Sequence, residues 1–393
     1  MLNKQEFRDH LVNKIIPFWK GLRDDEFGGY YGFMGYDLEV NKKADKGCIL
    51  NSRILWFFSN AYMVLKDDEA LADSLMSEAT HAYEFLRDHC LDNENGGIYW
   101  SMTYDGKPSD TMKHTYNQAF SIYALSSYYD ISHNKEALDK AYSIFNTIET
   151  KCCDEIGYLE ALDRNFNIIP NDALSENGVM ADRTMNTLLH VFEAYTELYR
   201  VTGDIQVKNK VIAIINAFAE KVYNPKLKRQ EVFFNNSWES IIDLHSFGHD
   251  IETAWLMDKG LDIIADDEIT AKMRPITKAL TEKIYETAFN GNSLANECEC
   301  GKVDERRIWW VQAETVLGFM NGYLRDNTKP EYMEASEATW KFIQDYFVDK
   351  RDGSEWFMDV RPDGTPYEGL EIVGPWKCPY HNGRMCIEVM RRM

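Results

Sequence analysis

Polar side chains that could move protons occur in pairs three or four residues apart, the spacing that places two side chains on one face of a helix. Asn186 and His190 form one such pair, and His249 and Glu252 form another. An imidazole accepts or donates a proton near neutral pH, and a neighbouring polar group can orient it. The two pairs therefore predict general acid and base catalysis.

Further residues that could bind a polar ligand lie near the expected beginnings of other helices. They are Arg53, Tyr116, Trp310, Glu314, Trp376 and His381. A single histidine at the edge of an apolar helix face is more often structural than catalytic. Because His190, His249 and His381 occupy corresponding positions of a repeated pattern, we interpret them as catalytic candidates.

A metal site is the competing interpretation of the central histidines. His245 and His249 are four residues apart and precede Glu252, but the HExxH order of hydrolytic zinc enzymes is absent. Cys298 and Cys300 are separated by one residue, which is a poor spacing for a zinc knuckle. We therefore expect no metal. The sequence also lacks a Walker loop, a GxGxxG motif after a strand and a Gly-x-Ser-x-Gly elbow, which argues against nucleotide, dinucleotide and serine-hydrolase chemistry.

The charge balance excludes two classes of partner. The 393 residues include 43 Lys and Arg against 64 Asp and Glu, a formal net charge of −21. Nucleic acids and anionic membrane surfaces bind clustered positive charge, so we expect neither as a partner. No run of eighteen apolar residues occurs, and the first residues, MLNKQEFRDH, do not form a signal peptide. We expect a cytoplasmic protein whose eight cysteines, which form no CxxC pair, are reduced.

Aromatic residues are the unusual part of the composition, at 13% of the chain. Aromatic rings stack on the apolar faces of sugars, whereas Arg, Asn and carboxylate groups bond to sugar hydroxyls. The expected ligand is therefore a neutral carbohydrate. Hydrolysis of a glycoside requires two carboxyl groups across the scissile bond, but epimerisation or isomerisation requires bases that remove a proton beside a carbonyl. The three histidine candidates favour the latter, with an inverting glycosidase that uses Glu252 and either Glu314 or Asp182 as an alternative.

Apolar residues recur at intervals of three and four through most of the chain, which predicts about twelve helices. The expected ranges are 3–21, 52–66, 69–90, 114–130, 135–150, 182–202, 205–222, 249–265, 268–288, 307–325, 331–347 and 379–391. The helices fall in pairs, and connections of roughly 20–35 residues separate the pairs. Each long connection carries a β-rich, mostly aromatic run, which predicts short β-hairpins at 29–33, 97–100, 157–160, 232–235, 293–296 and 355–358.

Helical hairpins that cannot bury both faces alone can do so by closing into a ring with an inner and an outer layer. No Gly/Ser linker or low-complexity tract divides the chain, so we expect one domain over residues 1–393. The predicted fold is all-α, an (α/α)6 barrel with the long connections gathered at one end around a cavity. An open solenoid is the competing architecture, but its repeats are usually shorter than these.

Four of the segments that carry the candidates resemble the N-acylglucosamine 2-epimerase superfamily. They are Arg183–His190, Gly248–Glu252, Trp309–Glu314 and Trp376–His381. Within the superfamily the chain is most similar to the cellobiose 2-epimerase branch, whose N-terminal motif resembles Lys46–Trp56, with Asn51 where a histidine is expected. The resemblance extends from about residue 10 to the C-terminus.

The resemblance implies an (α/α)6 barrel that interconverts a reducing-end glucose with mannose in cellobiose, and also in lactose and other β-1,4-linked disaccharides. It implies no metal or nucleotide cofactor for this step, and we expect a monomer. By position, His190, His249 and His381 match the catalytic histidines of the family. Its sugar-binding and supporting residues match Arg53, Tyr116, Asn186, Glu252, Trp310 and Trp376, to which we add Glu314 as a substrate-binding candidate.

The mechanism expected from these residues passes through a cis-enediolate. His381 removes the proton from carbon 2, and Arg53 stabilises the negative oxygen that forms. His249, oriented by Glu252, returns a proton to the opposite face, and His190 assists opening of the sugar ring. A monosaccharide aldose–ketose isomerase, an N-acylglucosamine 2-epimerase and a non-catalytic interaction protein are the further alternatives within the superfamily.

Overall fold

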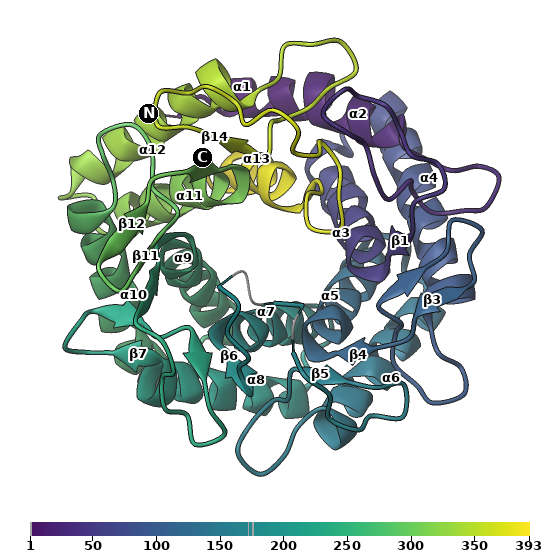
Figure 1. Ribbon diagram of the computed structural model, residues 1–393, viewed down its shortest axis with the longest axis horizontal. Coiled ribbons are helices and arrows are strands. Elements are labelled where there is room, and N and C mark those ends of the chain that lie inside the picture. Colours follow the sequence, from purple (N-terminus) through teal and green to yellow (C-terminus); the bar gives the residue numbers. More distant parts are fainter. Residues whose placement is uncertain (1, 172, 175–176) are drawn as a thin grey trace.

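Two concentric layers of helices form a closed ring in the computed structural model, which describes residues 2–171, 173–174 and 177–393 (Figure 1). The inner helices are α3 (Cys48–Leu65), α5 (Thr115–Ser132), α7 (Met185–Thr202), α9 (Phe247–Ile264), α11 (Trp309–Arg325) and α13 (Tyr380–Arg392). The outer helices are α4 (Glu69–Phe85), α6 (Lys135–Lys151), α8 (Ile205–Ala217), α10 (Asp267–Thr287) and α12 (Pro330–Phe342). The predicted (α/α)6 barrel is confirmed.

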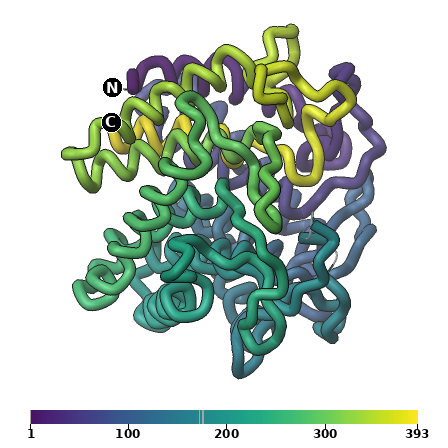
Figure 2. Tube along the Cα trace, turned by 60° about the vertical axis from the view of Figure 1, so that its left-hand side comes forward, coloured from purple at the N-terminus to yellow at the C-terminus, as the bar shows by residue number. Residues whose placement is uncertain are grey.

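The N-terminal segment supplies the remaining outer position of the ring. It consists of α1 (Lys4–His10), the π-helical turn η1 (Leu11–Ile15) and α2 (Ile16–Lys20), and α1 packs against α13 (Figure 2). Three other outer helices end in π-helical turns, namely η2 (Leu86–Cys90), η3 (Phe218–Val222) and η4 (Ile343–Phe347). Within the described residues, no helix combines the length and the apolar character needed to cross a membrane.

The two layers differ in how much of each helix is buried. Every residue of α5 from Thr115 to Tyr128 is buried, because this inner helix contacts neighbours on all sides. The outer helix α6 instead buries one stripe that includes Ala137, Ala141, Ile144 and Ile148, and the rest of its surface is polar. The difference accounts for the nearly continuous apolar character of the inner helices and the amphipathic pattern of the outer ones.

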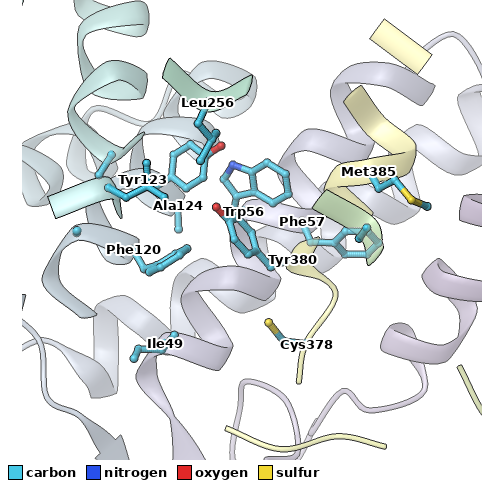
Figure 3. Close-up of a cluster of buried hydrophobic side chains, with 14 of the residues drawn as sticks. Ile49, Trp56, Phe57, Phe120, Tyr123, Ala124, Leu256, Cys378, Tyr380 and Met385 are labelled. Carbon is cyan, nitrogen blue, oxygen red and sulfur yellow. The ribbon is translucent and has the colours of Figure 1, made fainter. Parts of the chain in front are cut away.

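Many aromatic residues pack between the inner helices. The Trp56 ring centroid lies 5.4 Å from that of Tyr123 and 5.3 Å from that of Tyr380, which joins α3, α5 and α13 (Figure 3). Trp19, Trp56, Trp255 and Trp356 are among the largest fully buried side chains. A substantial part of the aromatic excess therefore fills the core, in addition to the loop positions that we expected.

Short strands join each long connection to the next around one end of the barrel. The pairs that precede inner helices are β1 (Lys46–Gly47) with β2 (Ser101–Met102), β4 (Lys113–His114) with β5 (Ala161–Leu162), β6 (Arg183–Thr184) with β9 (Phe233–Phe234), β10 (Leu244–Ser246) with β11 (Glu297–Glu299), and β13 (Arg307–Ile308) with β14 (Asp359–Val360). An antiparallel bridge between Met34 and Val373 joins the last connection to the first. The connections thus form a second closed ring above the helices.

Hairpins within single connections are fewer than predicted. They are β2 with β3 (Pro108–Asp110), β7 (Tyr223–Asn224) with β8 (Arg229–Gln230), and β11 with β12 (Lys302–Asp304). At the other connections, isolated bridges such as Arg23 to Tyr30 take their place. The aromatic runs are short, and their backbone groups are shared with neighbouring connections, which leaves little room for longer hairpins.

A buried basic side chain stands two residues before the start of several inner helices. Lys46, Lys113 and Arg183 form ion pairs with Asp24, Asp92 and Asp154 at 2.6, 3.1 and 2.6 Å, and His245 lies 2.8 Å from Asp250. Buried pairs of this kind contribute more to a unique geometry than to net stability. Here they fix the path of the chain as it enters each inner helix.

Candidate active site

The first two turns of the inner helices surround an open cavity of about 890 Å³, a volume that includes its mouth. All the predicted site residues except Glu314 line the cavity. They are brought together because the long connections and the starts of the inner helices lie at the same end of the ring.

His381, on α13, forms a hydrogen bond through Nδ1 to Oε1 of Glu314 at 2.7 Å. Arg384 and Trp255 also donate to Glu314, which therefore acts as an acceptor here, so we assign the hydrogen to Nδ1 of His381 and leave Nε2 free. Burial and the charge of Arg384 hold the pKa of His381 well below its usual range. Glu314 is fully buried beneath the cavity and also accepts from Trp255, so it positions His381 rather than lining the site as we expected.

His249, on α9, has a different partner from the one that we predicted. Its Nδ1 lies 2.7 Å from Oγ of Ser246, whereas Glu252 bonds to Arg384. Burial and the nearby His190 lower the pKa of His249 to about 3, so this imidazole is neutral at physiological pH. The predicted orientation by Glu252 is therefore wrong, because Ser246 in the preceding strand already occupies the Nδ1 position.

His190, on α7, bonds through Nδ1 to Oε2 of Glu193 at 3.0 Å. Its ring meets that of Tyr116 edge to face at a centroid distance of 4.9 Å. Burial alone would raise the pKa of Glu193, but the charge of Arg384 and the bond from His190 lower it to about 2. Glu193 is thus an anion that orients His190 with its Nε2 atom free.

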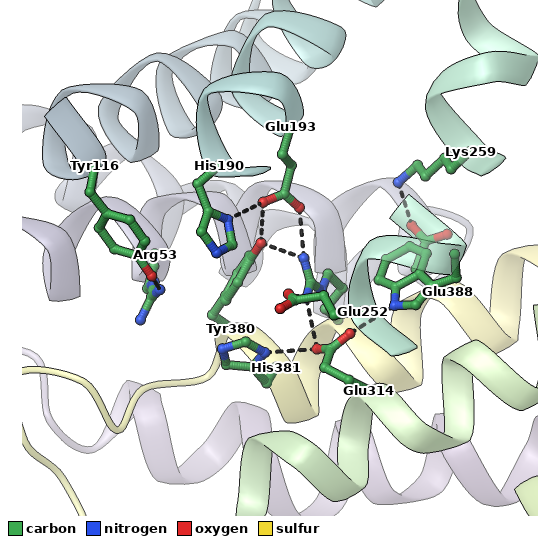
Figure 4. A network of polar contacts seen from close by, with 12 residues as sticks. Arg53, Tyr116, His190, Glu193, Glu252, Lys259, Glu314, Tyr380, His381 and Glu388 are labelled. Atoms are coloured by element: carbon green, nitrogen blue, oxygen red, sulfur yellow. Dashed lines mark hydrogen bonds and ion pairs between the residues drawn. The ribbon is translucent and has the colours of Figure 1, made fainter. Parts of the chain in front are cut away.

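A buried arginine links the groups behind these histidines, of which Figure 4 labels Glu193, Glu252, Glu314 and Tyr380. Arg384 bonds to Glu193 at 2.6 Å and to Glu314 at 2.7 Å, and it also contacts Glu252 and the Tyr380 hydroxyl. Burial and the neighbouring Glu314 raise the pKa of Glu252 to about 7. Sequence reasoning missed Glu193, Tyr380 and Arg384, although the spacing of Glu193 from His190 and of Arg384 from Tyr380 places each pair on one helix face.

Arg53 and Asn186 contribute polar side chains to the cavity wall. Arg53 bonds through Nη2 to the Tyr116 hydroxyl at 2.5 Å, and its guanidinium lies 4.2 Å from the Phe120 ring centroid. Its Nε and the side-chain oxygen of Asn186 are buried without a hydrogen-bond partner among the residues that the structure describes. Both side chains line the cavity and carry groups of the kind that bond to sugar hydroxyls.

The same groups do not form a favourable metal site. Ligand atoms of Glu252, Glu314 and His381 lie within 4.8 Å of one another. However, Nη2 of Arg384 bonds to both carboxylates and already supplies the positive charge between them. His245, the other ligand considered, is paired with Asp250 and does not line the cavity.

The aromatic candidates lie at the sides of the cavity. The Trp310 ring centroid is 4.7 Å from that of His249 and 5.5 Å from that of His381. Trp376 lies 6.0 Å from Tyr116 between ring centroids. Asn296 and Glu297, which the sequence reasoning did not select, also line the cavity, and they come from the connection that precedes α11.

A family model, related sequences and solved structures all match this chain over nearly its full length. The family model described as N-acylglucosamine 2-epimerase (GlcNAc 2-epimerase) matches residues 28–382. A protein of Ruminococcus albus named cellobiose 2-epimerase is 49% identical over 387 residues, which is 98% of each chain. The solved structure of a sugar epimerase from a ruminal bacterium has a TM-score of 0.96 at 48% identity, covering 99% of this chain and 98% of the other. A cellobiose 2-epimerase from Bacillus thermoamylovorans has a TM-score of 0.94 at 45% identity, covering 99% of both chains.

Proposed function

The chain belongs to the N-acylglucosamine 2-epimerase family and is a carbohydrate epimerase, and from this premise we propose that it is a cellobiose 2-epimerase. The reaction reversibly converts the reducing-end glucose of cellobiose to mannose, and lactose and other β-1,4-linked disaccharides are further substrates. The observation that carries the proposal is that His190, His249 and His381 surround one cavity in a chain similar over nearly its full length to enzymes of that name.

Ring opening is the first step of the proposed mechanism. His249, a neutral base, takes the proton from the hydroxyl on carbon 1, while His190 donates a proton to the ring oxygen. The bond between carbon 1 and the ring oxygen breaks, and an aldehyde forms at carbon 1. The anionic Glu193 holds Nδ1 of His190 by a hydrogen bond and so orients the ring for this transfer.

Proton exchange at carbon 2 follows. Nε2 of His381 removes the carbon-2 proton, and the electron pair moves to the carbonyl oxygen to give a cis-enediolate. Arg53 donates hydrogen bonds to the negative oxygen, the kind of electrostatic contribution that usually dominates such steps. After rotation about the bond between carbons 2 and 3, His249 returns its proton to the opposite face of carbon 2. In ring closure, His381 gives its proton to the oxygen on carbon 1, which restores the hydroxyl there. The ring oxygen bonds to carbon 1 again and returns to His190 the proton that it received during ring opening.

The arrangement of carboxylates disfavours the glycosidase alternative. Glu314 lies outside the cavity, and it shares the guanidinium of Arg384 with Glu252. Two carboxyl groups that face the same buried cation cannot stand on opposite sides of a glycosidic bond. Asp182, the other candidate, is exposed and does not line the cavity.

The test is incubation with cellobiose in heavy water without cofactor, followed by chromatography and NMR of the products. We expect 4-O-β-glucosyl-mannose with deuterium at carbon 2. Free glucose would support a glycosidase, accumulation of a ketose would support an isomerase, and a preference for N-acetylglucosamine would support the other family branch. Each of these outcomes would contradict the proposal.

The histidine roles are tested by His381→Ala and His249→Ala, each of which we expect to abolish turnover while the helical circular dichroism is retained. The matched control is His133→Asn, at a surface turn with a left-handed backbone (φ 54°) that asparagine tolerates. If either alanine variant keeps a rate near that of the wild type, the proton-transfer role of that histidine is wrong.

We further propose that the enzyme acts in the cytoplasm as a monomer. All eight cysteines are free, which is compatible with a reducing compartment. Light scattering of the purified protein tests the oligomeric state, and fractionation of the producing cells tests the location.

A further inference from the structure

Arg384 is a fully buried arginine on α13 that faces three carboxylates from three other inner helices. Nη1 bonds to Glu193 of α7, and Nη2 bonds to Glu314 of α11, at 2.6 and 2.7 Å. Nη2 also bonds to Glu252 of α9. A single guanidinium therefore ties three inner helices to the one that carries His381.

Two of these carboxylates hold catalytic candidates in place. Oε1 of Glu314 accepts hydrogen bonds from both Arg384 and Nδ1 of His381. Glu193 bonds to Arg384 through Oε1 and to Nδ1 of His190 through Oε2. The two imidazoles are thus the outer ends of one continuous chain of hydrogen bonds whose centre is the guanidinium.

We propose that Arg384 is a positioning residue for epimerisation, which holds His190 and His381 through Glu193 and Glu314 with both Nε2 atoms free for the substrate. This inference rests on the proposed function for its catalytic meaning. Arg384 does not line the cavity, so its action on the reaction passes through the carboxylates.

The physical reason is the charge of the cluster. Three carboxylates within reach of one another repel unless a cation lies between them, and a carboxyl group that takes up a proton can donate as well as accept. Without the guanidinium, Glu314 would separate from Glu252 or become protonated, and His381 would lose the partner that fixes its orientation and tautomer. The same holds for Glu193 and His190.

Other cations near the cluster are engaged elsewhere. Lys259 bonds to Glu388 at 2.9 Å, on the side away from the histidines (Figure 4). Arg53 directs Nη2 to Tyr116 and has Cys378 4.0 Å from its Nη1. Neither is in a position to take over the bonds that Arg384 makes to the three carboxylates.

The test is Arg384→Lys, which keeps the charge but cannot make bonds in the fixed planar geometry of a guanidinium. We expect kcat for cellobiose to fall about 100-fold with KM changed less than about twofold, because catalytic groups become misplaced while the cavity wall is intact. Exchange of the carbon-2 hydrogen with solvent should fall in parallel. The matched control is Arg391→Lys on the same helix, where Arg391 pairs with Glu388 at 2.9 Å, and it should keep the wild-type kcat.

A second readout does not require turnover. Hydrogen-bonded Nδ1 protons of His190 and His381 give downfield signals in the NMR spectrum of protein with ¹⁵N-labelled histidine. We expect both signals in the wild type and in Arg391→Lys, and we expect both to be lost or shifted in Arg384→Lys. If the wild type epimerises no disaccharide but the signals behave in this way, the proposed function fails and the positioning role stands.

Other outcomes overturn the positioning role. A folded Arg384→Lys protein with wild-type kcat, or with both signals unchanged, contradicts it. If that variant does not fold, Tyr380→Phe decides, because it keeps the guanidinium and removes only the hydroxyl that bonds to Arg384 and Glu193. We then expect a roughly fivefold to tenfold lower kcat with unchanged KM and a perturbed His190 signal only, and a wild-type kcat refutes the inference.

Discussion

Replacement of one buried acid outside the catalytic cluster should change how stability depends on pH. Glu160 is buried beside the start of α7, where its Oε1 accepts from the backbone N–H of Thr184 at 2.7 Å and its Oε2 from the Thr187 hydroxyl at 2.6 Å. Burial raises the pKa of Glu160 from its ordinary value of 4.5 to about 7, although these hydrogen bonds oppose the change. The perturbation is Glu160→Gln, which mimics the protonated carboxyl group.

The direction of the effect follows from proton linkage. Between pH 4.5 and 7 the folded protein keeps the proton on Glu160, whereas the unfolded chain releases it, so raising the pH destabilises the fold. The two pKa values differ enough to remove about 3 kcal/mol of stability over this range. With an unfolding entropy of about 2.1 cal/mol/K per residue, a chain of 393 residues should lose about 4 °C in Tm.

The assay is calorimetry or circular dichroism melting from pH 4.5 to 8. We expect the Tm of the wild type, relative to that of Glu160→Gln, to fall by about 4 °C across this range, because all other titrating groups are common to both proteins. The control Glu155→Gln removes an exposed acid from the same connection and should melt in parallel with the wild type. If the wild type and Glu160→Gln keep a constant difference in Tm at every pH, Glu160 is ionised in the folded protein and the reasoning is refuted.

Three further outcomes follow from the site geometry. Trp376→Ala should raise KM for cellobiose with little change in kcat, because an aromatic wall of the cavity is lost while the histidines keep their partners; steady-state kinetics will show whether kcat falls instead. Ser246→Ala should lower kcat about fivefold to tenfold, the value of one hydrogen bond to His249, and wild-type kinetics would mean that Ser246 does not orient it. Prolonged dialysis against EDTA should leave activity unchanged, because a guanidinium already occupies the acidic cluster, and a loss restored by a divalent cation would contradict this assignment.

The fold and most of the residues that line the cavity can be predicted from the sequence because they depend on local periodicity. Regular spacing of apolar residues predicts the helix pairs, and each long connection marks the start of an inner helix, so His190 and His381 could be placed at one end of the ring. Helix starts are less certain from periodicity alone. The inner helix α3 begins at Cys48 instead of residue 52, which places Arg53 in its second turn.

The hydrogen-bond partners of the polar groups were harder to predict, because they depend on residues far apart in the chain. Arg384 and Glu193 are separated by 191 residues, and no local pattern indicates that they touch. The partner of His249 was misassigned because helical spacing favoured Glu252, whereas the structure uses Ser246 in the strand before the helix. The buried bases that precede several inner helices, such as Lys46 and Lys113, were a repeated signal that the sequence contained and that could have been found.

Closure of the ring sets an order for folding. Lys14 bonds to the backbone oxygen of Asp349 and Trp19 bonds to Glu355, contacts that span 335 and 336 residues. Contacts of such long range form slowly, because the entropy of closing a large loop is lost before the contacts can compensate for it. Folding intermediates should therefore be open arcs of helix pairs with exposed apolar inner faces, which are prone to aggregate. Because His381 and Arg384 lie on the helix that completes the ring, these arcs should be inactive, and recovery of activity during refolding should lag behind recovery of helical structure.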